Sequence, residues 1–138
     1  MITPLDSKIF GPLFGDAETN ELLSEEAYVR ALVEVEAALA KAQAQLGIIP
    51  SSAGEQISRV DSKTLDIGAL TKGTMRSGFP IIALVQELRK QVDSSAAPYV
   101  HWGATTQDIM DTACVLQIRS VIKLFRDRLA DVLATTEQ

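Results

Sequence analysis

Residues 101–108 read HWGATTQD and bring together side chains that could bind or transfer charge. His101 is the sole histidine of the chain, and it could donate a hydrogen bond to an anion or move a proton. Thr105 and Thr106 stand where a long helix is expected to begin, so their hydroxyls and the free backbone N–H groups there could hold a carboxylate or phosphate. Gly103 permits close backbone approach to such a ligand. The stretch predicts a binding loop for an anionic substrate.

The spacing alone favours a structural interpretation of the same residues. A Thr-Thr-x-Asp run at a helix start is most often a cap, in which Asp108 stabilises the helix N-terminus. A single histidine beside Trp102 is more often packed than catalytic, and the tryptophan itself is expected in the core. Without further information, the anion site is therefore the weaker of the two interpretations.

Helical periodicity covers most of the chain after residue 18, and it is clearest between Ser24 and Gly47. Ser24 is expected to be the N-cap and Gly47 the left-handed residue that ends the helix. The expected buried stripe of this helix comprises Tyr28, Leu32, Val35, Leu39, Ala42 and Leu46. No strand alternation of useful length occurs, so the sequence predicts an all-α fold.

Shorter helices are expected in the middle of the chain. One covers residues 51–60, where Ser52 and Glu55 have capping-box spacing. Another lies within residues 61–76, and a third begins at Pro80. The expected buried face of the third comprises Ile81, Leu84, Val85, Leu88 and Val92.

From Thr106 onward, about 30 residues contain neither glycine nor proline, which predicts a helix about 45 Å long. Apolar residues occur on more than one side of it: Ile109, Ala113, Leu116, Val115, Ile118, Ile122, Phe125, Leu129 and Val132. Such a helix needs several partners, and the short helices before it cannot cover it. No C-terminal stop signal follows, so we expect a truncated polypeptide whose missing helices would pack here.

Composition excludes several classes of function. The formal net charge of -5 argues against a nucleic-acid surface, which needs clustered lysine and arginine. Cys114 is the sole cysteine, so no intramolecular disulfide and no cysteine-based metal site is expected. No run approaches the roughly 20 apolar residues of a membrane span, and no signal peptide is evident, so a cytoplasmic setting without membrane contact is expected.

The stretch HWGATTQDIMDTA resembles the fumarase/aspartase superfamily, in which a His-x-Gly-x-Thr-Ser-x-Asp pattern opens the first long helix of a central bundle. Here Thr106 replaces the more common serine and keeps the hydroxyl. The resemblance implies that His101, Thr105 and Thr106 hold a substrate carboxylate. It also places Ser77 in a second substrate-facing segment, although a solvated turn serine is an equal alternative.

The segments PLFGDAETNELLSEEAYVRALVEVEAALAKAQAQLGIIP and GFPIIALVQELR resemble the 3-carboxy-cis,cis-muconate cycloisomerase branch, which acts in protocatechuate breakdown. Adenylosuccinate lyase is the closest competitor, but its usual N-terminal Arg-Tyr pair is missing, since no arginine precedes Arg30. The resemblance implies a small N-terminal helical domain over residues 1–104 and the start of the central bundle over residues 105–138. It further implies a homotetramer whose active sites combine motifs from three subunits.

The same branch implies a reaction that needs no cofactor and no metal, on a small tricarboxylate substrate. The superfamily's second histidine region and its Gly-Ser-Ser-x-Met-Pro-x-Lys-x-Asn loop do not occur in the sequence. We therefore expect the proton-transfer residue to lie beyond residue 138, with His101 the sole possible catalyst within the chain. The alternatives are a fumarate-releasing lyase of the same superfamily and a non-catalytic helical interaction module, the second favoured by the apolar sides of the last helix.

Overall fold

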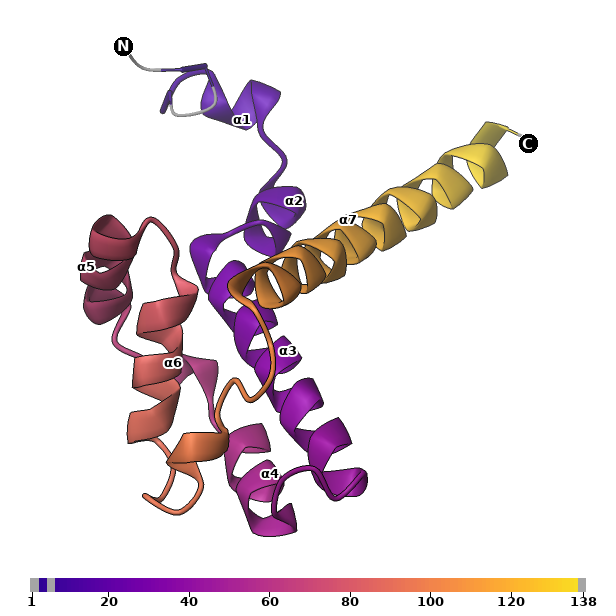
Figure 1. Cartoon of the computed structure of the whole chain (residues 1–138). Helices are drawn as coiled ribbons and strands as arrows, with labels where there is room; N and C mark the ends of the chain where they lie inside the picture. The colour runs from indigo at the N-terminus through magenta and orange to yellow at the C-terminus, as the bar shows by residue number, and fades with distance from the viewer. Residues whose placement is uncertain (1–2, 5–6, 137–138) are drawn as a thin grey trace.

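The computed structural model describes residues 3–4 and 7–136, and its regular elements are all helical (Figure 1). This confirms the all-α prediction. The α-helices are α1 (Gly11–Phe14), α2 (Ala17–Leu22), α3 (Glu25–Gln45), α4 (Ser51–Ser58), α5 (Ile67–Ser77), α6 (Ile81–Lys90) and α7 (Thr106–Thr136). Two short 3₁₀ helices, η1 (Ser62–Thr64) and η2 (Ala97–Tyr99), connect them.

Helix α3 forms the centre of the fold and has the ends that its sequence predicts. The Ser24 hydroxyl accepts a hydrogen bond from the backbone N–H of Ala27 at 3.1 Å, and Gly47 adopts a φ of 70° beyond the last turn. The predicted stripe is only partly correct: Leu32 is buried and Tyr28, Val35 and Leu39 are half-buried, but Ala42 and Leu46 are exposed. The residues of α3 that are buried are Ala27, Val29, Ala31, Leu32, Val33, Glu36 and Ala40. The buried face differs from the predicted stripe because both α4 and α7 pack against α3.

Helix α4 packs very closely against the C-terminal half of α3. A Cβ atom on Gly54 would lie 2.5 Å from the Cβ of Ala44 and 3.0 Å from the carbonyl oxygen of Ala40, so a side chain at this position would not fit. The capping box predicted for this helix is wrong. Pro50 is the N-cap residue, and Ser52 lies exposed inside the first turn.

Helices α5 and α6 form an antiparallel pair beside α3 (Figure 1). Asp66 caps α5 through a hydrogen bond from the backbone N–H of Ala69 at 3.1 Å. Four residues of the buried face predicted for α6 are fully buried: Ile81, Leu84, Val85 and Leu88. The turn between the two helices uses Gly78, whose φ of 79° lies in the left-handed region.

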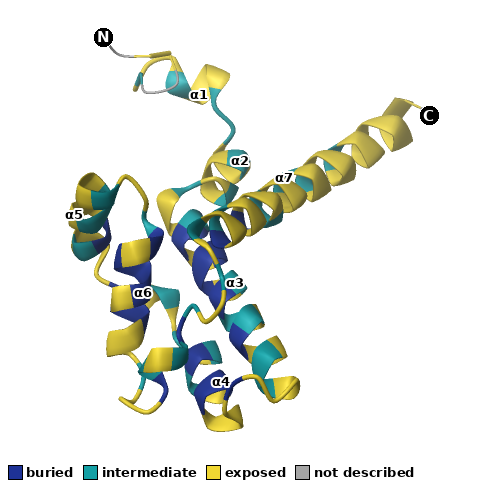
Figure 2. Ribbon diagram, in the orientation of Figure 1, coloured by how far each residue is buried: buried dark blue, intermediate teal, exposed yellow. Residues whose placement is uncertain are grey.

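Helix α7 packs closely on the rest of the molecule through its first half and then projects away from it (Figures 1 and 2), where ion pairs from Arg128 to Asp16 and Glu18 are a further contact. Ile109 and Ala113 are its buried residues. Its large exposed apolar side chains are Val115, Ile118, Ile122, Phe125, Leu129, Val132 and Leu133. The prediction that the shorter helices cannot cover this rod is confirmed. None of the helices within residues 3–4 and 7–136 has the length and apolar character needed to cross a bilayer.

Candidate functional site

The loop between η2 and α7 is strained, and contacts from two other helices fix its backbone. His101 has a φ of 63°, a left-handed conformation that costs a non-glycine residue roughly 1–2 kcal/mol. Gln43 of α3 donates from its side-chain amide to the carbonyl oxygen of Trp102 at 2.7 Å. Arg89 of α6 donates to the carbonyl oxygen of Val100 at 3.5 Å. These contacts hold the histidine in place on both sides.

Glu36 of α3 lies behind the histidine ring, 65 residues earlier in the sequence. A hydrogen bond of 2.6 Å joins Oε1 of Glu36 and Nδ1 of His101. Glu36 is 1% exposed, whereas the His101 side chain is 18% exposed and reaches the surface. Burial raises the pKa of Glu36, and the hydrogen bond from His101 opposes that rise. Sequence reasoning missed this residue.

Thr105 and Asp108 cap the start of α7, as the structural interpretation predicts. The backbone N–H and the hydroxyl of Thr105 donate to Oδ2 of Asp108 at 2.8 and 2.9 Å. These two bonds stabilise the charged carboxylate, so they hold the pKa of Asp108 below its ordinary value. The donors at the helix N-terminus are therefore already shared with an internal anion.

A cleft of about 200 Å³ opens between α6, the loop and the start of α7. It is lined by Ile81, Ile82, Val85, Gln86, Arg89, His101 and Thr106. The isoleucines and the valine form an apolar wall. The remaining four side chains offer a guanidinium, an imidazole, an amide and a hydroxyl, all of which can donate to a carboxylate.

The structure brings together two of the four residues singled out from the sequence. His101 and Thr106 line the cleft, while Thr105 adjoins it and is engaged with Asp108. Ser77 is not among the lining residues; its hydroxyl donates to the carbonyl oxygens of Gly73 and Phe79 at 3.0 and 2.8 Å.

The expectation that Trp102 lies in the core is wrong. The residue is 48% exposed and touches Tyr99, with ring centroids 5.9 Å apart. The residues on either side of it, His101 and Gly103, both have a left-handed backbone, with φ of 63° and 69°.

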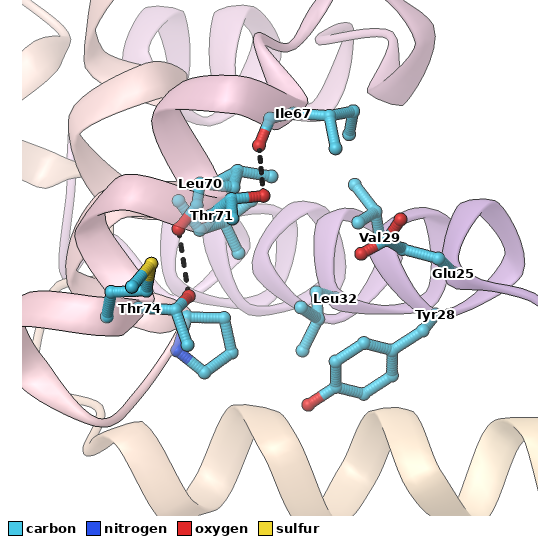
Figure 3. Close-up of a pocket in the computed structure, with 11 residues that line it drawn as sticks. Glu25, Tyr28, Val29, Leu32, Ile67, Leu70, Thr71 and Thr74 are labelled. Atoms are coloured by element: carbon cyan, nitrogen blue, oxygen red, sulfur yellow. Dashed lines mark hydrogen bonds between the residues drawn. The ribbon is translucent and has the colours of Figure 1, made fainter. Parts of the chain in front are cut away.

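A second cavity, of about 440 Å³, lies between α3, α5 and α6 (Figure 3). Its walls are largely apolar, with Val29 and Leu32 facing Leu70. The hydroxyls of Thr71 and Thr74 donate to carbonyl oxygens of their own helix and are not free for a ligand. The cavity contains no histidine or arginine, so the smaller cleft is the better site for an anion.

The sequence is similar to several known proteins, although no family model matches it. The chain is 41% identical over 136 residues to the 3-carboxy-cis,cis-muconate cycloisomerase of Acinetobacter baylyi. This match covers 94% of the chain and 30% of the relative. It is 34% identical over 117 residues to the adenylosuccinate lyase of Methanocaldococcus jannaschii, covering 84% of the chain and 25% of that protein.

A solved structure of the same kind of enzyme has a similar fold. The crystal structure of β-carboxy-cis,cis-muconate cycloisomerase from Acinetobacter calcoaceticus sp. ADP1 superposes with a TM-score of 0.83 at 40% identity. This match covers 89% of the chain and 30% of the solved structure. The chain thus spans about three tenths of the length of the proteins it matches. Sequence motif, helical architecture and relatives agree, and the chain belongs to the fumarase/aspartase superfamily.

Proposed function

We propose that this chain forms one wall of the active site of a 3-carboxy-cis,cis-muconate cycloisomerase. The observation that carries the proposal is the cleft in which His101, Thr106 and Arg89, from the loop, α7 and α6, converge. The similarity to cycloisomerase of Acinetobacter strain ADP1, at 41% identity in sequence and with a TM-score of 0.83 in structure, supports this substrate.

The reaction is an isomerisation and needs no cofactor. One carboxylate oxygen of the substrate bonds to a carbon of a double bond in the same molecule, which closes a γ-lactone. The adjacent carbon takes up a proton, so the product, 4-carboxymuconolactone, is an isomer of the substrate when both are counted as free acids and carries one negative charge fewer when both are ionised. After the ring closes and before the proton arrives, negative charge accumulates on the carboxylate next to that carbon. Preorganised donors that face this charge lower the barrier.

The lining of the cleft matches what such a substrate demands. Arg89 supplies a permanent positive charge, and Gln86 and Thr106 supply neutral donors around it. Ile81 and Ile82 offer an apolar surface for the unsaturated carbon chain. In the proposal, the proton is delivered by a residue outside this chain, and His101 holds a carboxylate.

Thr105 remains in the proposal as a second donor next to Thr106. Its hydroxyl and backbone N–H are near the surface and now donate to Asp108. A substrate carboxylate would share these donors with Asp108. Ser77, whose hydroxyl bonds to its own turn, stays a weaker candidate for the same substrate.

We propose that the whole protein is a homotetramer with active sites shared between subunits. The exposed apolar residues of α7 from Val115 to Val132 follow steps of three and four, the spacing of helices that pack along their length. A helix with this pattern gains stability only when other helices cover it.

The test is the turnover of 3-carboxy-cis,cis-muconate by the whole protein and by its Thr106→Val variant. Loss of one donor to a charged substrate costs about 1.5–3 kcal/mol, so kcat/KM should fall roughly 10- to 150-fold. Thr112→Val is the matched control, because the Thr112 hydroxyl donates to the backbone oxygen of Asp108 within α7 and does not line the cleft. Wild-type kinetics in Thr106→Val would remove the cleft from the mechanism.

A fumarate-releasing lyase is the second candidate, favoured by the 34% identity to an adenylosuccinate lyase. The same assay separates the two. Loss of muconate absorbance supports the cycloisomerase, whereas fumarate released from adenylosuccinate supports the lyase.

A further inference from the structure

The contact between Glu36 and His101 combines two unfavourable features in one place. Glu36 is 1% exposed, and its Oε2 has no hydrogen-bond partner among the described residues. His101 is the one non-glycine residue within the described part of the chain that has a positive φ. Buried unpaired polar atoms and strained backbone cluster at functional sites, because elsewhere a less costly residue would serve.

The position of Glu36 in its helix makes a purely structural role a poor explanation. Its neighbours on the buried face, Leu32, Val33 and Ala40, are apolar. An apolar side chain of similar size would pack there without the desolvation cost that a buried carboxylate carries. The carboxylate is therefore suited to a task that an apolar side chain could not perform.

That task follows from the chemistry of imidazole. A neutral histidine has one N–H donor and one lone pair, and the partner of one ring nitrogen decides which form is present. Oε1 of Glu36 lies 2.6 Å from Nδ1, while no described residue forms a hydrogen bond with Nε2. His101 also lines the cleft, so Nε2 is the ring nitrogen left for a ligand.

We propose that Glu36 is a positioning residue: its carboxylate accepts the Nδ1–H of His101 and thereby presents Nε2 to a substrate carboxylate in the cleft. The identity of that carboxylate rests on the function proposed above, whereas the pairing of Glu36 with Nδ1–H does not. When an anion binds at Nε2, a proton there lets His101 donate to Glu36 and the anion together, with Glu36 as the counter-charge.

The charged groups around the ring come from three helices. Glu36 belongs to α3, Arg89 lines the cleft from α6, and Asp108 interacts electrostatically with His101 from α7. Two carboxylates and one guanidinium thus face the surroundings of the ring. Among the three, Glu36 alone has a hydrogen bond to the ring.

The test uses the fact that His101 is the sole histidine of the 138-residue chain. A long-range proton–nitrogen correlation spectrum of the ¹⁵N-labelled chain near neutral pH shows directly which ring nitrogens carry a proton. We expect Nδ1 to be protonated in the wild type. An unprotonated Nδ1 would overturn the proposal, since Glu36 would then be the donor.

Two variants complete the experiment. Glu36→Gln offers an amide in place of the carboxylate and should shift the ring toward the Nε2–H form. Glu34→Gln removes the same charge from an exposed position of α3 and should leave the spectrum unchanged. Equal spectra for wild type and Glu36→Gln, or equal shifts in both variants, would overturn the proposal. If Glu36→Gln fails to fold, the wild-type spectrum alone decides.

In the whole protein, Glu36→Gln should lower kcat/KM for 3-carboxy-cis,cis-muconate by about tenfold or more and alter its pH profile, with Glu34→Gln as the control. Unchanged kinetics and an unchanged profile would contradict the positioning role. Absence of turnover in the wild type would instead refute the proposed function and leave the spectroscopic result standing.

Discussion

Thr105 caps the start of α7. Its hydroxyl and its backbone N–H both donate to Asp108, so this carboxylate occupies the position that a ligand anion would otherwise take at a free helix N-terminus. Thr106, one residue later, lines the cleft. Under the proposed function, Thr105 chiefly caps the helix and Thr106 chiefly binds the ligand.

Thr105→Ala should lower the free energy of unfolding by about 1 kcal/mol, because it removes the N-cap of α7. Thr105→Ser keeps a hydroxyl and should stay close to wild type. Urea denaturation followed by circular dichroism measures both. If the Thr105→Ala and Thr105→Ser variants both unfold at the wild-type urea midpoint, the cap at α7 does not stabilise the chain.

The residues of the loop could be found from sequence, whereas those that approach it from other helices could not. His101 and Thr106 share one short motif and are close together by necessity. Glu36 and Arg89 reach the loop through the packing of α3 and α6. One signal for Glu36 existed, a carboxylate among buried apolar positions, but the stripe predicted for α3 lay on a displaced face.

At the scale of elements, the contact of α3 with α4 depends on the missing side chain of Gly54. Gly54→Val should destabilise the fold by about 1–3 kcal/mol, since its side chain would collide with Ala40 and Ala44. Ser52→Val places the same residue at an exposed position of α4 and should change stability by less than about 0.5 kcal/mol. Thermal unfolding of both variants is the measurement, and equal losses would contradict the close approach.

An ion-pair cluster fastens α2 to the projecting part of α7. Arg128 donates to Oδ2 and Oδ1 of Asp16 at 2.7 and 3.3 Å, and to Glu18 at 2.9 Å. Asp16 also caps α2, accepting from the backbone N–H of Thr19 at 2.7 Å. These contacts, the Arg128 pair first among them, lower the pKa of Asp16 from 3.8 to about 2.

The stability that Asp16 contributes should depend on pH in one direction. Because its pKa is lower in the folded state, the contribution is complete above pH 3.8 and is lost as the pH falls toward about 2. Asp16→Asn keeps an N-cap but removes the charge. Its unfolding midpoint should lie below that of the wild type near neutrality and converge with it near pH 2. A difference that is constant over this range would exclude the ion pair as its cause.

The helix ends agree with those predicted from the sequence where local signals dominate. Ser24, Gly47 and the glycine- and proline-free run after Thr106 set their helices by local chemistry. The capping box of α4 failed because Pro50, just before it, already begins the helix. Which face of α3 is buried depends on its packing against α4 and against the distant α7, and no local period encodes that.

At the scale of the whole molecule, α7 carries an uncovered apolar row. We expect the chain to associate as its concentration rises, and Ile122→Glu to weaken this association because it places a charge in the row. Ala134→Glu adds the same charge on the opposite side of the helix and is the control. Sedimentation velocity gives the result, and a chain that stays monomeric at all concentrations would favour the non-catalytic helical module.

The central claim is that the cleft between α6, the loop and α7 holds a substrate carboxylate. A crystal structure of the whole protein with bound 3-carboxy-cis,cis-muconate tests it most directly. We predict a carboxylate oxygen within hydrogen-bond distance, about 2.6–3.2 Å, of both Nε2 of His101 and the Thr106 hydroxyl. A substrate bound elsewhere, with this cleft empty or filled by protein side chains, would contradict the claim.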